Sequence, residues 1–157
     1  MGIVSRAQLL SAVAAARQQG ARVVMSNGCF DALHDGHRYS LESAATHGDR
    51  LVVAVNDDAS VRRLKGPGRP HDGLALRMAN LAALECVDWV VAFSAPTPVA
   101  LIDAVAPDVL VKGSDYRCET IAGAAGVLAR GGQVVIVDRL PGLSTSRRLA
   151  AARDVGR

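Results

Sequence analysis

Aromatic residues are scarce in this chain of 157 residues: two Phe, two Tyr and one Trp make up 3% of it. So few aromatic side chains do not favour the stacking platforms on which single-stranded nucleic acids bind. The basic residues are not clustered either, since no block of five or six lysines and arginines occurs. We therefore expect no nucleic-acid partner.

Long apolar runs are also missing. Hydrophobic residues make up half of the chain, but every run is interrupted well before the roughly 18 residues that a membrane span needs. The segment 1–6 lacks the hydrophobic region of a secretory signal and does not match the myristoylation pattern. These features favour a cytoplasmic protein without a membrane partner.

Cysteine and lysine are few. Cys29, Cys86 and Cys118 are widely spaced and form no Cys-x-x-Cys pair, so neither a disulfide framework nor a zinc site is favoured. Reduced thiols fit a cytosolic protein better. Two lysines stand against sixteen arginines. Arginine is common where phosphates or carboxylates bind, although compositional drift in an Ala- and Arg-rich chain gives the same excess.

What the chain does contain is an alternation of short apolar runs and amphipathic segments. Strands are predicted at 22–26, 51–55, 89–93, 109–111 and 134–137, and helices at 5–17, 35–47, 59–64, 74–85, 98–105, 119–130 and 144–153. This order predicts an α/β fold, a Rossmann-like three-layer sandwich with a five-stranded parallel sheet. We expect one domain over 1–157, with an N-terminal helix in 1–20 and the α/β core in 21–157.

The loop after the first predicted strand carries the strongest chemical signal. In such sheets, ligands bind outside the carboxyl ends of the strands. There, His34 and His37 bracket Gly36 at the predicted start of a helix. A helix N-terminus offers unpaired N–H groups that suit phosphate, and imidazoles can add hydrogen bonds. Gly36 would let the backbone approach the ligand closely. The loop therefore predicts a phosphate site.

The sequence GCFDALHDGH at 28–37 resembles the signature of the cytidylyltransferase-like nucleotidylyltransferase superfamily. Within it, the chain is most similar to the adenylyltransferase domain that acts on D-glycero-D-manno-heptose 1-phosphate in ADP-heptose synthesis. The resemblance covers nearly the whole chain, in the segments 27–37, 55–61, 64–70, 77–78, 87–91, 111–116 and 143–146. It implies transfer of the adenylyl group of ATP to a sugar 1-phosphate, giving an ADP-sugar and pyrophosphate.

The resemblance also implies roles for residues at matching positions. His34, His37 and Lys65 would contact the triphosphate and stabilise charge in the transition state. The nucleotide-binding residues would be Asn27, Gly28, Cys29, Phe30, Gly36, Asp115, Tyr116, Arg139, Ser144, Thr145 and Ser146. Independently of the resemblance, Arg69 and Arg77 are candidates for binding the acceptor phosphate.

Simpler interpretations stay open for several of these positions. Lys65 begins a loop with two Gly and two Pro, where it could be an ordinary solvated lysine. Arg69 and Arg77 could be surface charges. Ser144 could be a helix cap, although three successive hydroxyls exceed what one cap needs. The acidic pair at 57–58 is better explained as a helix cap than as metal ligands.

The implied reaction needs no covalent nucleophile and no strong base, because the attacking phosphate is already anionic. Mg²⁺ is the expected cofactor, bound mainly by the phosphates of the nucleotide, and we predict no protein ligand for it. The other expected partners are small-molecule substrates. The resemblance also allows a homodimer and, if the chain acts alone, requires a separate sugar kinase upstream.

Two other function classes stay open. A cytidylyltransferase acting on glycerol 3-phosphate or a similar alcohol phosphate is compatible with the segment 139–146. A non-catalytic nucleotide-binding module would be expected to have lost His34, His37 or Lys65, and all three are present. Dinucleotide oxidoreductases and P-loop enzymes are disfavoured, because the sequence has neither Gly-x-Gly-x-x-Gly after its first strand nor a Walker A motif.

Overall fold

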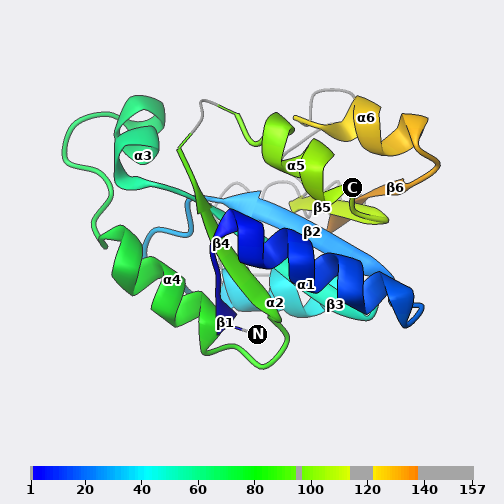
Figure 1. The fold of residues 1–157 in the computed structure, drawn as a ribbon. Helices are drawn as coiled ribbons and strands as arrows, with labels where there is room; N and C mark the ends of the chain where they lie inside the picture. Colours follow the sequence, from blue (N-terminus) through cyan, green and yellow to red (C-terminus); the bar gives the residue numbers. More distant parts are fainter. Residues whose placement is uncertain (1, 95–96, 114–121, 138–157) are drawn as a thin grey trace, which may run out of the picture.

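The computed structural model describes residues 2–94, 97–113 and 122–137. Its strands are β1 (Gly2–Ile3), β2 (Val23–Gly28), β3 (Arg50–Asn56), β4 (Trp89–Phe93), β5 (Val109–Gly113) and β6 (Gln133–Val137). Its helices are α1 (Arg6–Gln18), α2 (Asp35–Ala45), α3 (Asp58–Lys65), α4 (Leu74–Ala82), α5 (Val99–Val105) and α6 (Ala124–Ala129). Figure 1 shows their arrangement.

The strands form one parallel sheet in the order β1-β4-β3-β2-β5-β6. From β2 the chain steps outward through β3 to β4, and it then returns to the other side of β2 for β5 and β6. The direction of winding therefore reverses between β2 and β5, which is the place where such sheets bind ligands. The predicted Rossmann-like α/β fold with a parallel sheet is confirmed.

The predicted number of strands was wrong, because the described residues alone form a sheet of six strands rather than five. The additional strand, β1, is two residues long and pairs Gly2 with Trp89 and Ile3 with Val90 at the edge of the sheet. Two residues are too few to show a hydrophobic period. Only the pairing with β4 makes this segment a strand.

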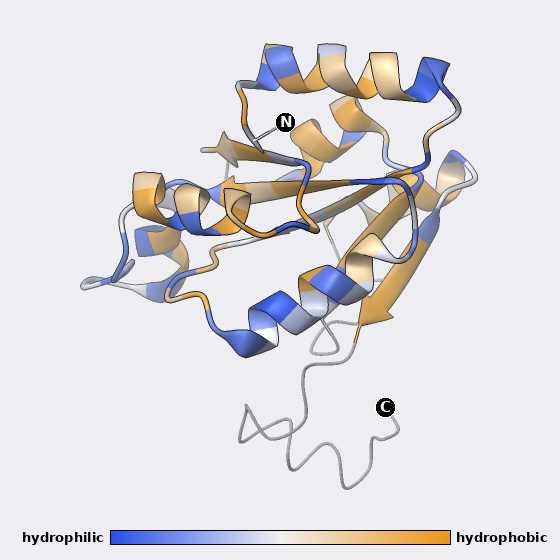
Figure 2. Cartoon of the chain, turned by 90° about the horizontal axis from the view of Figure 1, so that it is seen from below, coloured by the Kyte–Doolittle hydropathy of each residue, from blue (hydrophilic) through white to orange (hydrophobic). Residues whose placement is uncertain are grey.

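Helices cover both faces of the sheet (Figure 1). On one face, α1, α5 and α6 pack on the strands, and Leu9, Ile102 and Val127 are among their fully buried side chains. On the other face, α2 and α4 contribute Leu41 and Leu81. Successive strand residues point to opposite faces, so strands covered on both sides are apolar throughout. In Figure 2 the strands between the two layers are accordingly mostly hydrophobic.

Local sequence signals explain some of the helix boundaries. Ser5 and Gln8 form a capping box at the start of α1, where the sequence predicts a helix. The helix predicted at 35–47 ends earlier in the structure, because α2 ends at Ala45 and its C-cap is Thr46. A Cβ at Gly48 would lie 2.6 Å from a methyl of Val24, so the glycine allows close packing on β2. The helix predicted at 144–153 lies outside the described residues.

Trp89 is 5% exposed within the core, as its apolar strand predicts. In the described part of the chain, we find no helix with the length and apolar character needed to cross a membrane.

Candidate active site

The loop between β2 and α2 has an unusual backbone. Phe30 and Ala32 adopt positive φ angles of 50° and 56°, a region that residues other than glycine rarely occupy. Gly28 helps to make this path possible, since a Cβ there would lie 3.2 Å from the Phe30 ring. Strained backbone of this kind is concentrated at ligand sites. The loop lies at the carboxyl end of β2, next to the point where the winding of the sheet reverses.

Two histidines begin α2 and cap its first turn. The Gly36 N–H donates to Nδ1 of His34 at 3.0 Å, and the His34 N–H donates to Nδ1 of His37 at 3.3 Å. The two rings stack with centroids 4.0 Å apart, and Phe30 meets His37 edge-on at 5.6 Å. Because each Nδ1 accepts a hydrogen bond, a neutral ring carries its proton on Nε2. Both rings therefore offer an Nε2–H donor at a helix N-terminus.

Asp31 fastens a second loop to the first. Its side chain is fully buried and accepts hydrogen bonds from Arg69 Nε at 2.9 Å, from the His71 N–H at 2.8 Å and from the Asp72 N–H at 2.9 Å. Burial on its own would raise the pKa of Asp31, but the N–H groups of Asp72 and His71 and the Arg69 guanidinium hold that pKa well below its usual range. Arg69 is thus ion-paired beside the histidine loop and is more than a surface charge.

Lys65 stands at the end of α3, where the second loop begins. It is exposed, and it makes no hydrogen bond or ion pair with the other described residues. Asp31 ties the far part of this loop to the histidine loop, so Lys65 belongs to the same end of the sheet. Its predicted contact with the triphosphate stays a prediction.

Arg77 is 1% exposed, so the interpretation as a surface charge was wrong. Its guanidinium donates to the carbonyls of Asp72, Cys29 and Asn56 and to the carboxylate of Asp58, at 2.7–2.9 Å. These bonds connect the loops after β2 and β3 to the start of α4. We assign Arg77 to this framework, because its donors are directed at protein acceptors instead of at an acceptor phosphate.

Lys112 near the end of β5 was not singled out as a site residue from the sequence. Its ammonium donates to the backbone carbonyl of Asn27 at 2.7 Å and to Asn27 Oδ1 at 3.2 Å. Burial lowers the pKa of Lys112 to about 8, although the nearby Cys29 thiol opposes the shift. The sequence did offer one signal, because one of its only two lysines stands at the end of an apolar run. Its contact with β2 could not be predicted, because that contact depends on the order of the strands in the sheet.

The acidic residues at this end of the sheet are engaged in the framework. Asp57 caps α3 by accepting the Ser60 N–H at 2.8 Å, as predicted, and Asp58 pairs with Arg77. In the described ranges no three His, Cys, Asp or Glu residues are grouped to hold a metal ion.

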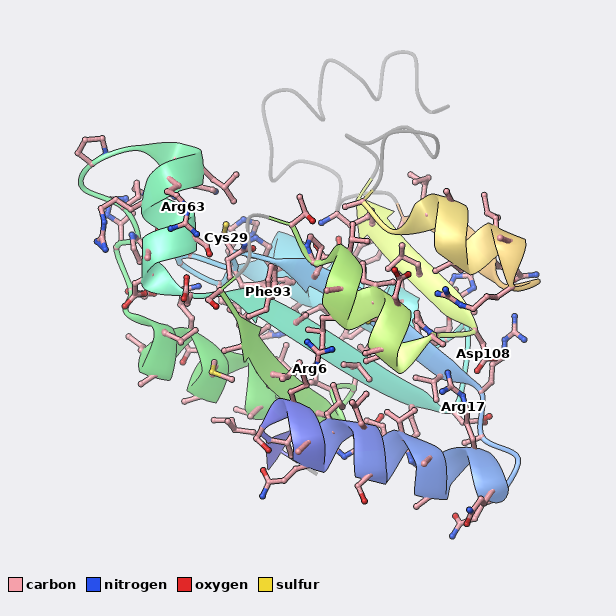
Figure 3. All side chains as sticks on the ribbon, turned by 45° about the horizontal axis from the view of Figure 1, so that its top comes forward. Arg6, Arg17, Cys29, Arg63, Phe93 and Asp108 are labelled. Carbon is pink, nitrogen blue, oxygen red and sulfur yellow. The ribbon has the colours of Figure 1, made fainter. Side chains whose placement is uncertain are left out.

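The predicted site residues of the first loop gather at one end of the sheet. Figure 3 shows Cys29 there with Arg63 and Phe93, and Arg17 and Asp108 at the opposite end. Six predicted nucleotide-binding residues lie outside the described residues: Asp115, Tyr116, Arg139, Ser144, Thr145 and Ser146. The described part combines imidazole N–H groups, a helix N-terminus and basic side chains, which together suit a polyanion.

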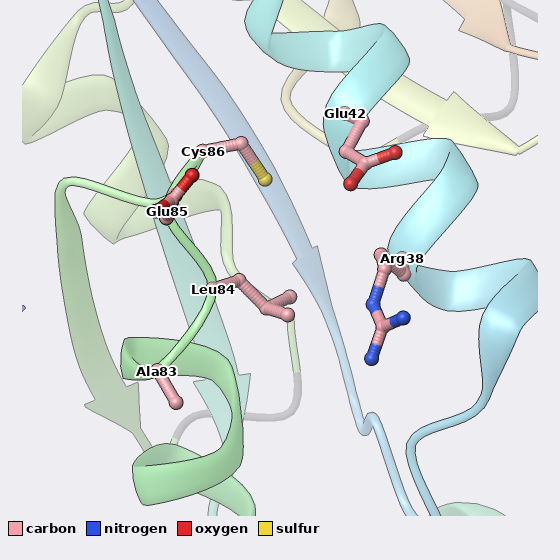
Figure 4. A pocket seen from close by; sticks show the side chains of 6 residues that line it. All are labelled: Arg38, Glu42, Ala83, Leu84, Glu85 and Cys86. Carbon is pink, nitrogen blue, oxygen red and sulfur yellow. The ribbon is translucent and has the colours of Figure 1, made fainter.

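A hollow lies between α2 and the segment after α4 (Figure 4). It is lined by Arg38, Glu42, Ala83, Leu84, Glu85 and Cys86. Burial, together with the nearby Glu42 carboxylate, raises the pKa of the Cys86 thiol. A protonated thiol beside carboxylates is a poor nucleophile and a poor anion ligand, so the candidate site is the histidine loop.

Comparison with known proteins identifies the family. The family model described as "Cytidylyltransferase-like" matches residues 25–147. The chain belongs to the cytidylyltransferase-like family. The predicted superfamily is thereby confirmed, and with it the class of enzyme, a nucleotidyltransferase. The match begins in β2 and includes the histidine loop, the loop fastened by Asp31, and Lys112.

The chain is also similar to proteins named "Bifunctional protein HldE". It is 58% identical to that of Alkalilimnicola ehrlichii over 156 residues and 56% identical to that of Aeromonas hydrophila over 155 residues, covering 98% and 99% of this chain. It spans only 33% of the length of each. Among solved structures, a lipopolysaccharide core biosynthesis protein from Thermoplasma volcanium matches with a TM-score of 0.62 and 28% identity. That match covers 77% of this chain and 98% of the other.

Proposed function

We propose that this nucleotidyltransferase transfers the adenylyl group of ATP to a sugar 1-phosphate, D-glycero-D-manno-heptose 1-phosphate being the first candidate. The observation that carries the proposal is the stacked pair His34 and His37 at the N-terminus of α2, with both Nδ1 atoms used for capping and both rings able to donate from Nε2. The similarity to the HldE proteins supports the heptose substrate.

In the proposed reaction, an oxygen of the sugar phosphate attacks the α-phosphorus of ATP in line. A new phosphorus–oxygen bond forms while the bond to the bridging oxygen of the β-phosphate breaks, and pyrophosphate leaves with that electron pair. The attacking oxygen is already anionic, so no strong base is needed. The enzyme contributes positioning and donors that bind the transition state more tightly than the ground state.

The described residues divide this work between them. The Nε2–H groups of His34 and His37, at the positive end of the α2 dipole, donate to phosphate oxygens where negative charge accumulates. Lys65 adds positive charge from the end of α3. Arg69, held by Asp31 and one-third exposed, is our candidate for the phosphate of the acceptor. Mg²⁺ would enter with the nucleotide and screen its phosphates.

The remaining roles rest on the sequence resemblance alone. Asp115 and Tyr116 would lie near ribose and base. Ser144, Thr145 and Ser146, with Arg139, would hold phosphates at a second helix N-terminus. A homodimer stays a prediction. A separate sugar kinase is expected only if this chain acts alone, and its length, a third of the HldE proteins, does not decide that.

The test is a panel in which pyrophosphate release is measured with ATP, CTP, GTP or UTP against heptose 1-phosphate, glucose 1-phosphate or glycerol 3-phosphate. We expect ATP with heptose 1-phosphate to give the highest kcat/KM. Higher activity with CTP and glycerol 3-phosphate would leave the family unchanged but overturn the proposed substrates. A chain that binds a nucleotide without releasing pyrophosphate from any pair would be a binding module.

A further inference from the structure

The contact between Lys112 and Asn27 joins the two strands between which the winding of the sheet reverses. Lys112 lies in β5 and Asn27 in β2, and the strands run parallel side by side with Ser26 opposite Val111. One ammonium group holds both the backbone carbonyl and the side-chain oxygen of Asn27. Asn27 is also the first residue of the predicted nucleotide loop.

This contact fixes which way the amide of Asn27 faces. An ammonium group has three donors and no acceptor, so it can bind Oδ1 but not the Nδ2 group of the amide. The two N–H donors on Nδ2 are therefore turned away from Lys112. Without the ammonium, the amide could rotate by a half-turn and present its oxygen where its donors had been.

A neutral donor would satisfy a backbone carbonyl at less cost than a lysine. Taking an ammonium group out of water is unfavourable, and two of the oxygens that accept from Lys112 here belong to one residue, Asn27. A positive charge and fixed N–H donors at the same place both attract phosphate.

We propose that Lys112 is a positioning residue of the nucleotide site, which holds the amide of Asn27 with its N–H donors toward the triphosphate and adds positive charge behind it. The proposal rests on the proposed function. It predicts that Lys112 acts through Asn27, so the two side chains contribute to nucleotide binding as one unit.

The experiment is a double-mutant cycle of Lys112→Met, Asn27→Ala and the double variant, with KM for ATP, KM for the sugar phosphate and kcat measured for each. We expect each single variant to raise KM for ATP about tenfold and to change KM for the sugar phosphate less than twofold. The double variant should be no worse than the more affected single variant, because coupled residues are not additive. A native KM for ATP in Lys112→Met would overturn the proposal. So would a double variant whose KM for ATP rises by the product of the two single effects.

A matched control separates positioning from stability. Arg17 also donates to backbone carbonyls, those of Val105 and Ala106, but at the opposite end of the sheet. Arg17→Met should lower the melting temperature and leave KM for ATP within twofold. If Lys112→Met does not fold, Lys112→Gln replaces it, because a neutral amide can occupy the same space. We expect KM for ATP to rise in this variant as well, since the positive charge is lost.

Calorimetric titration measures the Kd of ATP and of CTP without the reaction, so a failure of this inference can be told from a failure of the proposed function. If the native chain uses CTP, the same cycle is run with CTP, and coupling between Lys112 and Asn27 would support the inference although adenylyl transfer had failed. If the native chain binds neither nucleotide, both proposals are wrong. If it binds ATP and Lys112→Met binds equally well, only the inference about Lys112 is wrong.

Discussion

In the proposed mechanism, His34 and His37 each perform two tasks with different ring nitrogens. His34 Nδ1 accepts the Gly36 N–H and His37 Nδ1 accepts the His34 N–H, which stabilises the start of α2. The same bonds determine the tautomers, so Nε2 carries the proton that a phosphate oxygen can accept. A ring whose position is set by the fold loses little freedom when it binds, and preorganised donors of this kind account for much of transition-state stabilisation.

Replacing His37 by Ala should therefore reduce turnover more than nucleotide binding. We expect kcat to fall about 10²–10³-fold, which corresponds to roughly 2.7–4 kcal/mol for one lost donor, while the Kd for ATP changes less. The same result is expected for Lys65→Ala. His47→Ala, beyond the end of α2, is the control and should be unaffected. A native kcat in either site variant would remove that residue from the mechanism.

Lys112 makes the stability of the protein depend on pH in a direction that can be checked. Its pKa in the folded chain is about 8, against about 10.4 in an unfolded chain. Between these values the unfolded chain binds a proton that the folded chain does not, so stability rises with pH. Urea unfolding at pH 7 and pH 9.5 should show the native chain gaining stability relative to Lys112→Met. An equal difference in stability at both pH values would contradict a half-buried Lys112 with a lowered pKa.

Residues with local signals were predictable, and those defined by contacts between strands were not. His34, Gly36 and His37 form a pattern within four positions, directly after a strand and a turn. Lys112 and Arg77 look like isolated charges in the sequence. Their burial and their partners depend on which strands are neighbours, a property that no short window of residues contains.

At the scale of elements, the candidate site depends on how two loops are joined. The loop after β2 carries the histidines, and the segment between α3 and α4 carries Arg69. Asp31 connects them with one ion pair and two backbone N–H bonds, and Arg77 connects both to the end of β3. The segment that carries Arg69, our proposed residue for the acceptor phosphate, is therefore held by side chains of the framework as well as by regular structure.

Asp31→Asn should loosen this connection. In this variant an amide NH2 group would face N–H donors whose hydrogen bonds the carboxylate accepts in the native chain. We expect the free energy of unfolding at pH 7 to fall by about 1.5–3 kcal/mol. Amide hydrogen exchange in 66–73 should accelerate, and kcat/KM for the sugar phosphate should fall. Because the pKa of Asp31 is depressed in the folded state, this stability is present above the unfolded pKa of about 3.9 and is lost as the pH falls toward the folded value.

Asp103→Asn is the matched control for that variant. Asp103 pairs with Arg130 at 3.4 Å, and both side chains are more than a third exposed. Exposed pairs contribute about 1 kcal/mol or less, so stability and kcat/KM should change little. Equal losses in the two variants would show that Asp31 has no special place in the site.

Element boundaries followed from caps and glycines where the chain determines them locally, as in α1. Sequence signals did not predict the end of α2, which lies before the predicted position. Gly48 follows this helix, and its missing Cβ allows close contact with β2. β1 shows the same limit, since its two residues become a strand only because β4 accepts them as a neighbour.

At the scale of the whole molecule, the parallel sheet brings distant segments to one end, as predicted from the alternation of strands and helices. Its strand order places Lys112 of β5 beside Asn27 of β2, and the same end receives the histidine loop and the loop fixed by Asp31. The family match covers this arrangement. The chemistry of the substrates is the part that the fold does not determine, because one site of this kind can serve different nucleotides and acceptors.

The most direct test of adenylyl transfer is phosphorus NMR of the purified chain with ATP, Mg²⁺ and D-glycero-D-manno-heptose 1-phosphate. We predict that the α-phosphorus of ATP becomes joined to the phosphorus of the sugar phosphate in a new diphosphate diester, while pyrophosphate accumulates in equal amount. Formation of ADP and orthophosphate, or unchanged ATP under conditions in which CTP is consumed with an alcohol phosphate, would contradict the account.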